Sequence, residues 1–217
     1  LQKCKQPSSL GMLDRFEKYR VWLERGYNLG ILGNHSIDYR PEKWKLMYNV
    51  HSSLPYVASG YTVRTRGVTQ ALSERGFDIV VNARWGFPLD KEINVDDGIV
   101  PEIMNLDGIE HIFTPDVGGM KEFKDEEFVH KAAQSLLNRA MEIRPSVIHA
   151  ASDHSIGLPA SMVANALGIP FFYEMRGLWA LSRAANHPNF VFDPKFPLMM
   201  RLERQCAEAA DHVFVIS

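Results

Sequence analysis

The sequence predicts an α/β fold: a Rossmann-like, doubly wound and mostly parallel sheet with helices on both faces, plus an N-terminal helical extension. Strand-like segments alternate with helical segments of ten or more residues across 45–217, and this alternation requires right-handed crossovers that leave neighbouring strands parallel. Several strand segments, "IPFFYEM" among them, are continuous apolar runs. Such runs are typical of strands that helices cover on both sides.

The composition is that of a globular protein with one sizeable core. Of the 217 residues, 46% are hydrophobic and 23% are charged, which is ordinary for this class. The formal net charge of -2 gives no electrostatic basis for a nucleic-acid partner. No apolar run approaches the roughly 20 residues that span a bilayer. Cys4 and Cys206 lie far apart without metal-ligand spacing, so a reducing, cytosolic setting is predicted.

Residues 1–44 are predicted to form a helical extension and a linker, separate from the domain at 45–217. The stretch "MLDRFEKYRVWLERGYN" carries apolar residues at helical spacing and ends near Gly26; the face consists of Leu13, Phe16, Tyr19 or Arg20, and Leu23. One interpretation is a helix that touches a membrane surface, and the other is a helix packed on the main domain. Acidic residues are interleaved with the basic ones, which favours packing.

The main domain is predicted as an ordered series of strands and helices. The expected strands are 45–51, 77–84, 109–115, 146–152, 169–175 and 211–217, and the expected helices are 61–76, 125–145, 157–168 and 194–210. Gly76 and Pro145 are the stop signals of the first two helices. Residues 85–108 are expected to be rich in loops, with a short irregular strand.

In such a sheet, ligands bind outside the carboxyl ends of the strands. This rule selects the segments "SSLPYVASGY", "ARWGFP", "TPDVGG", "HAASDHS" and "EMRGLW". They contain most of the glycine, proline, arginine, histidine and tryptophan expected of a site. Trp85 and Trp179 could stack on a sugar ring, although aromatic residues at crevice edges usually pack.

The stretch "SGYTVRTRG" opens a helix directly after the first strand. It lacks the G-x-G-x-x-G fingerprint of dinucleotide binding and a Walker lysine, so a tight pyrophosphate cradle is not expected. Gly60 could let a ligand approach the helix N-terminus, or it could merely permit a turn. Ser59 or Thr62 could cap this helix. Arg64, near the corner, is a candidate for an anionic ligand, whereas Arg66 fits a solvated face.

Two further strand ends carry ionisable side chains. His149 closes a buried strand, where a core histidine is the more common role, and Asp153 beside His154 in the following loop could handle protons. Glu174 and Arg176 lie at the end of the next strand. They could form a structural ion pair, or they could bind a sugar hydroxyl or a phosphate. No zinc set and no G-x-S-x-G elbow accompany them.

Three blocks together resemble the N-terminal half of a family 4 glycosyltransferase of the GT-B fold. They are "SGYTVRTRGVTQALSERGFDIVVNAR", "VIHAASDHSIGLPASMVANALGIPFFYEMRGLW" and "ERQCAEAADHVFVIS", and the similarity covers about 45–217. The resemblance implies two Rossmann-like domains across a cleft, a nucleotide-sugar donor held mainly by a C-terminal domain, and a sugar or glycolipid acceptor. It also implies retention of anomeric configuration without a metal or other cofactor.

Carried over by position, Gly60 matches the family's loop glycine, which approaches the donor phosphates or the transferred sugar. His149 matches the first histidine of an "HxH"-like strand end, whose second histidine is replaced by Ala151; His154 could substitute for it. The predicted catalytic residues are therefore His154 and His149, and the predicted substrate-binding residues are Ser59, Gly60, Tyr61, Arg64, Asp153, Glu174 and Arg176.

The leading hypothesis is retaining transfer of a sugar from a nucleotide-sugar to an acceptor hydroxyl, in bacterial polysaccharide or glycoconjugate synthesis in the cytoplasm or at the inner membrane face. The chain starts at Leu1 and stops in the apolar run "ADHVFVIS", so it is expected to be an inactive piece of a longer enzyme that lacks its C-terminal domain. One alternative is a non-catalytic sugar- or partner-binding module. A nicotinamide oxidoreductase is disfavoured because the glycine fingerprint is absent.

Overall fold

A computed structural model of the chain describes residues 17, 19–33, 38–91, 93, 95, 99–116 and 125–216. Its strands are β1 (Lys45–Val50), β2 (Asp78–Ala83), β3 (Ile103–Leu106), β4 (Ile109–Ile112), β5 (Val147–Ala151), β6 (Phe171–Met175) and β7 (His212–Val215). The helices are α2 (Gly60–Ser73), α4 (Asp125–Ile143), α5 (His154–Leu167), α6 (Trp179–Asn186) and α7 (Lys195–Ala209), with 3-10 turns η1 (Leu89–Lys91) and η3 (Pro188–Phe192).

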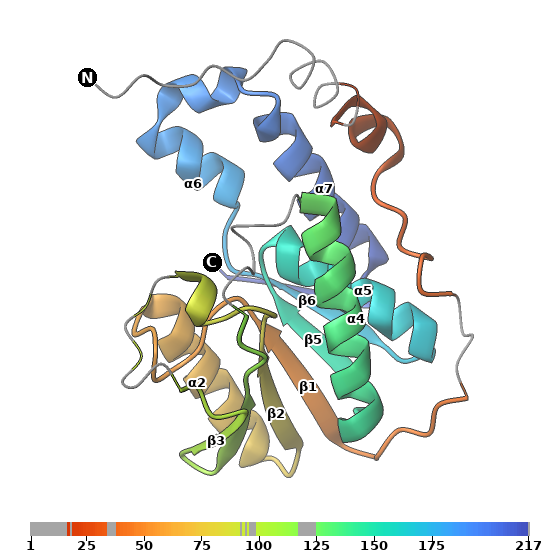
Figure 1. Cartoon of the computed structure of the whole chain (residues 1–217), viewed down its shortest axis with the longest axis vertical. Coiled ribbons are helices and arrows are strands. Elements are labelled where there is room, and N and C mark those ends of the chain that lie inside the picture. The colour runs from red at the N-terminus through yellow and green to blue at the C-terminus, as the bar shows by residue number, and fades with distance from the viewer. Residues whose placement is uncertain are drawn as a thin grey trace.

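The strands form one seven-stranded sheet in the order β3-β4-β2-β1-β5-β6-β7 (Figure 1). Among the described strands, only β3 runs antiparallel to its neighbour, and the other pairings are parallel. The predicted mostly parallel α/β sheet is therefore confirmed. The chain winds outward from β1 to β4 on one side and from β5 to β7 on the other, so the order reverses between β1 and β5. Such a reversal opens a crevice at the carboxyl ends of the strands.

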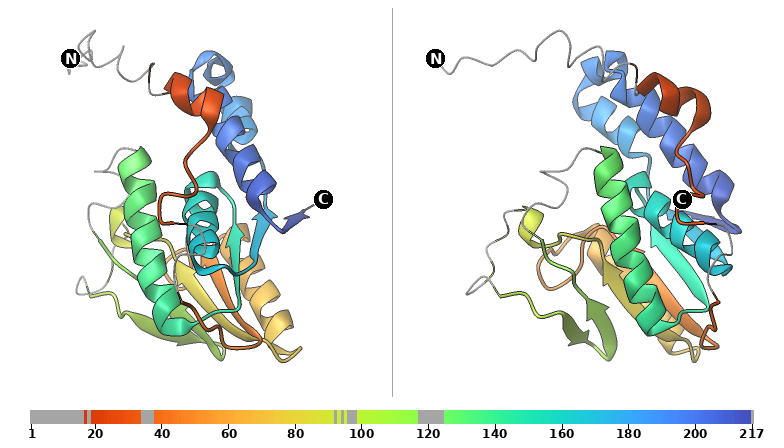
Figure 2. Two further views of the ribbon diagram at one scale, coloured as in Figure 1. Left: turned by 90° about the vertical axis from the view of Figure 1, so that its right-hand side faces the viewer. Right: turned by 45° about the vertical axis from the view of Figure 1, so that its right-hand side comes forward.

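Alternation along the strands divides the core between the two faces of the sheet. Met47 of β1 packs in the cluster that contains the buried residues of α4, α5 and α7, whereas its neighbours Leu46 and Tyr48 pack in the cluster that α2 covers. Figures 1 and 2 show α2 on one side of the sheet and α4 with α5 on the other. Successive strand residues point to opposite faces, which explains how one apolar run serves both clusters.

The helix starts follow local capping rules. Ser59 caps α2 through its side chain, and Thr62 completes a capping box from within the helix. Asp153 caps α5 by accepting the backbone N–H of Ser155 at 3.0 Å. With this cap, α5 begins at His154, three residues before the predicted start at 157. The sequence did not predict α6, whose eight residues directly follow the strand-end loop of β6.

The N-terminal extension packs on the main domain. Residues 19–25 are helical, and Tyr19 and Trp22 are buried in the cluster formed with α4, α5 and α7. Gln205 of α7 accepts the backbone N–H of Tyr27 at 2.7 Å and donates to its carbonyl oxygen at 2.6 Å. This helix therefore packs on the main domain. Trp22 contributes to the packing, although the predicted apolar face did not include it. Two predicted members of that face, at positions 13 and 16, lie outside the described residues.

The contact between α5 and α7 depends on a glycine. A Cβ built on Gly157 would lie 2.7 Å from both the Cys206 sulfur and the Tyr173 ring. We therefore expect Gly157→Ala to lower the free energy of unfolding by about 1–3 kcal/mol, the usual cost of overpacking, as measured by urea denaturation.

A matched control is Gly67→Ala in α2. Its Cβ would have no heavy atom of the described structure within 4 Å beyond its own helix, so this change should raise the free energy of unfolding by roughly 0.5–1 kcal/mol. Equal effects of the two substitutions would contradict the assigned α5–α7 packing.

Candidate functional site

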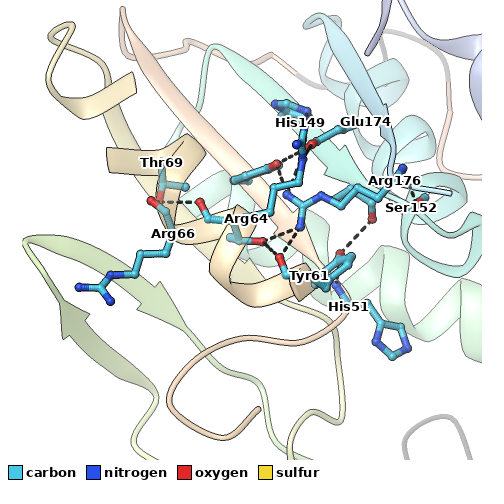
Figure 3. A network of polar contacts seen from close by, with 12 residues as sticks. His51, Tyr61, Arg64, Arg66, Thr69, His149, Ser152, Glu174 and Arg176 are labelled. Carbon is cyan, nitrogen blue, oxygen red and sulfur yellow. Dashed lines mark hydrogen bonds and ion pairs between the residues drawn. The ribbon is translucent and has the colours of Figure 1, made fainter. Parts of the chain in front are cut away.

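A buried carboxylate organises the carboxyl edge of the sheet near α2 (Figure 3). The side chain of Glu174, only 3% exposed, accepts Arg64 Nε on Oε1 at 2.6 Å and Arg176 Nη2 on Oε2 at 3.0 Å. The hydroxyl of Tyr48 also donates to Oε2. The three donors come from α2, from the loop after β6 and from β1. One carboxylate thus joins two strands and a helix that are distant in sequence.

Arg176 is committed to the protein around it. Its Nη1 donates to the carbonyl oxygen of Tyr61 at 2.7 Å and to the Thr65 hydroxyl at 2.8 Å, and its guanidinium lies 4.4 Å from the centre of the Tyr61 ring. Its backbone N–H donates to the Ser152 hydroxyl at 3.1 Å. With a side chain 4% exposed, Arg176 fixes the N-terminal turn of α2 against the ends of β5 and β6.

Arg64 is the accessible cation of this cluster. Its side chain is 43% exposed and faces a pocket of about 330 Å³ whose lining is Gly60, Tyr61, Arg64, Arg176, Gly177, Trp179, Ser182 and Ile216. The two guanidinium groups outnumber the single carboxylate beside them. The pocket is therefore suited electrostatically to an anionic group.

Gly60 leaves the pocket open at the start of α2. Its φ is not in the left-handed region, so the corner itself does not demand glycine. A Cβ built on it would have no described heavy atom within 4 Å beyond its own helix. Neither turn geometry nor packing in the described structure requires a glycine here, so the explanation that Gly60 merely permits a turn loses its support.

His149 contacts the same cluster as a neutral imidazole. Its Nε2 lies 3.8 Å from Glu174 Oε2 and has no hydrogen-bond partner among the residues described, and its ring lies 4.4 Å from that of Tyr48. Burial lowers the pKa of His149, the Glu174 charge opposes this shift and the Arg176 charge adds to it, and together they bring the pKa to about 4. His149 therefore does not carry a positive charge at neutral pH.

Glu174, in contrast, stays ionised. Burial alone would raise the pKa of this carboxyl, but hydrogen bonds from Arg176, Tyr48 and Arg64 and the charge of Arg176 lower it to about 2. A carboxylate with such partners is a structural counter-ion rather than a proton donor or acceptor near neutral pH.

The second predicted catalytic histidine lies elsewhere. His154 is the first residue of α5 and lines a different cavity together with Trp22 and Tyr27, and it is not among the residues that line the Gly60 pocket. The Asp153 carboxylate is held in the N-cap of α5 by Ser155. The structure thus brings together Ser59, Gly60, Tyr61, Arg64, His149, Glu174 and Arg176, whereas Asp153 and His154 line the other cavity and not the Gly60 pocket.

Sequence reasoning missed two residues of this edge, Tyr48 and His51. Tyr48 sits inside an apolar run, and only its strand register beside His149 reveals that it faces Glu174. The His51 backbone N–H donates to the Tyr61 hydroxyl at 2.9 Å, and the His51 ring lies 5.9 Å from that of Trp179. Burial and the charge of Arg84 lower the pKa of His51 to about 4. The sequence feature that could have identified His51 as a site residue is its position directly after β1.

The two tryptophans of the predicted edge differ. Trp179 is 42% exposed on the rim of the Gly60 pocket, whereas Trp85 packs on the ring of Phe128 at 5.9 Å. Among the described residues, no group of three or more histidine, cysteine, aspartate or glutamate side chains is arranged to hold a metal ion. No helix in that part of the chain is long and apolar enough to cross a bilayer.

Comparison with known proteins assigns the family. The profile of the "Glycosyl transferase 4-like domain" matches residues 59–217. The chain belongs to the glycosyl transferase 4-like domain family. This membership confirms the resemblance to family 4 glycosyltransferases stated from the sequence. The matched region begins at the α2 cap, Ser59, and includes every predicted site residue. No curated protein matches this glycosyltransferase-like domain.

Solved structures similar to this domain include a candidate UDP-N-acetylglucosamine 2-epimerase from Listeria monocytogenes, with 14% identity and a TM-score of 0.49 over 80% of this chain and 39% of that one. They also include Arabidopsis thaliana UGT89C1 complexed with UDP, with 14% identity and a TM-score of 0.46 over 80% of this chain and 42% of that one. The domain thus spans about two fifths of the structures it matches.

The Glu174 cluster predicts a pH-dependent stability. At pH 7, Glu174→Gln should lower the free energy of unfolding by about 3–5 kcal/mol, because Arg64 and Arg176 lose their buried counter-ion. Since folding lowers the carboxyl pKa from 4.5 to about 2, the stabilisation is complete above about pH 4.5 and disappears as the pH falls towards 2.

Urea denaturation of both proteins between pH 7 and pH 3 measures this difference. Glu142→Gln, which removes an ion pair whose carboxylate is 64% exposed, serves as the control and should change stability by less than about 1 kcal/mol. A gap between wild type and Glu174→Gln that stays constant down to pH 3 would argue against the ionised cluster.

The His149 imidazole should not titrate in the neutral range. Because its pKa is about 4, its ring ¹⁵N chemical shifts in NMR spectra should stay those of a neutral ring from pH 8 to pH 5.5. The exposed His187 provides an internal comparison. A His149 midpoint near 6.5 would contradict the buried position assigned to this side chain.

Proposed function

We propose that this chain is the N-terminal half of a retaining glycosyltransferase that moves a hexosyl group from a nucleotide-sugar donor to an acceptor hydroxyl, in polysaccharide or glycoconjugate synthesis. The observation that supports this most directly is the open backbone of Gly60 beside the exposed guanidinium of Arg64 in a glycosyl transferase 4-like domain. The chain spans about two fifths of the structures it matches, so we assign the remaining donor contacts to a C-terminal domain.

Arg64 and the start of α2 suit the phosphate end of the donor. Glycosyl transfer leaves a nucleoside diphosphate, whose negative charge grows as the bond to the sugar breaks. A positioned cation and the N-terminus of a helix stabilise that charge without moving during the reaction. Arg64 is held through its Nε by Glu174, while its side chain remains 43% exposed and lines the Gly60 pocket.

The remaining predicted residues take supporting roles in this proposal. Glu174 and Arg176 are positioning residues, because Glu174 accepts from both arginines and both outer nitrogens of Arg176 donate to protein partners. Ser59 holds the helix start that Gly60 leaves accessible, and the Tyr61 ring and Trp179 border the space for the sugar.

His149, the predicted catalytic residue nearest to this pocket, is neutral and next to Glu174. We assign it a hydrogen-bonding role at Nε2 rather than the role of a cationic acid. His154 and Asp153 are assigned to the acceptor side, because His154 lines the other cavity. No strong general base is required of these residues, since retention at the anomeric carbon depends chiefly on stabilising charge.

The test uses the full-length product of the parent gene and a panel of nucleotide-sugars, with release of nucleoside diphosphate and sugar transfer both measured. Arg64→Gln should lower kcat/KM by about 10- to 100-fold, which corresponds to the loss of one charge-assisted hydrogen bond to phosphate.

Arg66→Gln is the matched control. Arg66 lies on the same helix but pairs with Asp107 at 2.7 Å and is 52% exposed, so this change should alter kcat/KM less than about threefold. Full activity of Arg64→Gln would refute the assigned role. Donor binding without any transfer would favour the alternative, a non-catalytic sugar- or partner-binding module.

A further inference from the structure

A second cavity, of about 240 Å³, lies between the N-terminal extension and helices α4, α5, α6 and α7. It shares no lining residue with the Gly60 pocket. The extension, α6 and α7 lie together in Figure 2 beyond the carboxyl end of the sheet. The volume exceeds the roughly 150 Å³ of an apolar cavity that holds benzene, so an aromatic ring or a short alkyl chain fits inside.

The interior of this cavity is aromatic and aliphatic. Trp22 and Tyr27 form the wall on the side of the extension, and Phe128, Leu158 and Leu198 form the rest together with their neighbours. All five side chains are at most 7% exposed. The wall is fixed by the paired hydrogen bonds between Tyr27 and Gln205. The family match begins at residue 59, so the extension supplies this wall from outside the matched region.

The lining also carries two cations, Arg183 of α6 and Lys195 at the start of α7. Arg183 is exposed and lies 4.3 Å from the centre of the Phe190 ring, and Lys195 is half-buried. Within the described part of the chain neither has a carboxylate partner. The one carboxylate in the lining, Asp153, is engaged by the Ser155 N–H and hydroxyl. The lining thus combines an apolar interior with an excess of positive charge.

The N-terminus of α5 does not supply an anion site here. The Ser155 N–H donates to the Asp153 side chain, and the N–H groups of Ile156 and Gly157 donate to the Asp153 carbonyl oxygen. An acidic group in the cavity must therefore be bound by side chains, and Arg183 and Lys195 are the cations available for it.

We propose that this cavity binds an anionic amphiphile: a ring or alkyl chain inside, and a phosphate or carboxylate group at Arg183 and Lys195. If the proposed glycosyl transfer holds, this ligand is the acceptor or its lipid-like anchor. Helix α6 connects the two sites, because Trp179 and Ser182 line the Gly60 pocket and Arg183 lines the cavity. An occupant of the cavity therefore lies one short helix away from the donor pocket.

The first experiment measures binding to this chain by titration calorimetry, with octyl phosphate as the probe and octyl glucoside as the uncharged comparison, both below their micelle concentrations. Octyl phosphate should bind with one-to-one stoichiometry and at least tenfold more tightly than octyl glucoside. Equal affinities, or no saturable binding of octyl phosphate, would overturn the proposal.

Three variants locate the binding. The double substitution Arg183→Gln with Lys195→Gln should weaken octyl phosphate binding at least tenfold, and Leu198→Trp should abolish it by filling the cavity. Arg204→Gln is the control, because Arg204 lies on α7 but is 75% exposed and pairs with Glu208; it should change affinity less than twofold. If Leu198→Trp does not fold, the double charge variant still tests the site. Unchanged affinity for octyl phosphate in that double variant would refute the proposed site.

The acceptor role has a separate readout in the full-length protein. Leu198→Trp should abolish sugar transfer while nucleotide-sugar binding stays within twofold of wild type. Intact transfer in a variant that no longer binds octyl phosphate would show that the cavity does not hold the acceptor. If octyl phosphate binds as expected but the full-length protein transfers no sugar from any nucleotide-sugar, the proposed glycosyl transfer is refuted. The proposed ligand site in the cavity is then still supported.

Discussion

The buried carboxylate of Glu174 is the interaction on which the carboxyl edge of this domain depends. A charge with so little exposure is tolerated only when hydrogen bonds and opposite charges compensate its lost hydration. Tyr48, Arg64 and Arg176 supply that compensation from β1, from α2 and from the loop after β6. Each of these segments is thereby held in a fixed orientation at the point where the strand order reverses, and removing the charge would release all three at once.

Arg176 and Arg64 have different roles in this cluster. Arg176 is enclosed by the Tyr61 carbonyl, Thr65 and Glu174, with only 4% of its side chain exposed, so it stabilises the protein. Arg64 uses one nitrogen on Glu174 and remains 43% exposed, so it can bind an anion while the carboxylate fixes its position. A preorganised cation of this kind loses little conformational entropy on binding and needs no rearrangement as negative charge develops. Burial and not residue type makes the difference between the two.

The short helix α6 contributes residues to both cavities. It follows the loop of Arg176 and contributes to the lining of the Gly60 pocket and of the apolar cavity under the extension. The extension itself is joined to α7 through Gln205 and buries Tyr19 and Trp22 in the common core. Residues outside the family match thus complete a cavity beside it, and the extension lines this cavity as well as packing in the core.

The sequence by itself determined the architecture: alternating apolar strands and long helices predict a mostly parallel sheet, and strand ends rich in Gly, Arg and His predict which edge carries the site. It also identified Gly60, Arg64, His149, Glu174 and Arg176 as members of that edge, because these residues lie at strand ends or a helix start. Only the tertiary structure decided that Tyr48 faces Glu174, that His154 belongs to another cavity, and that Arg176 is buried while Arg64 is open. These outcomes depend on strand register, on the position of the α5 cap and on packing between distant segments. Local sequence encodes the elements, but side-chain burial and pairing arise from contacts between residues more than a hundred positions apart.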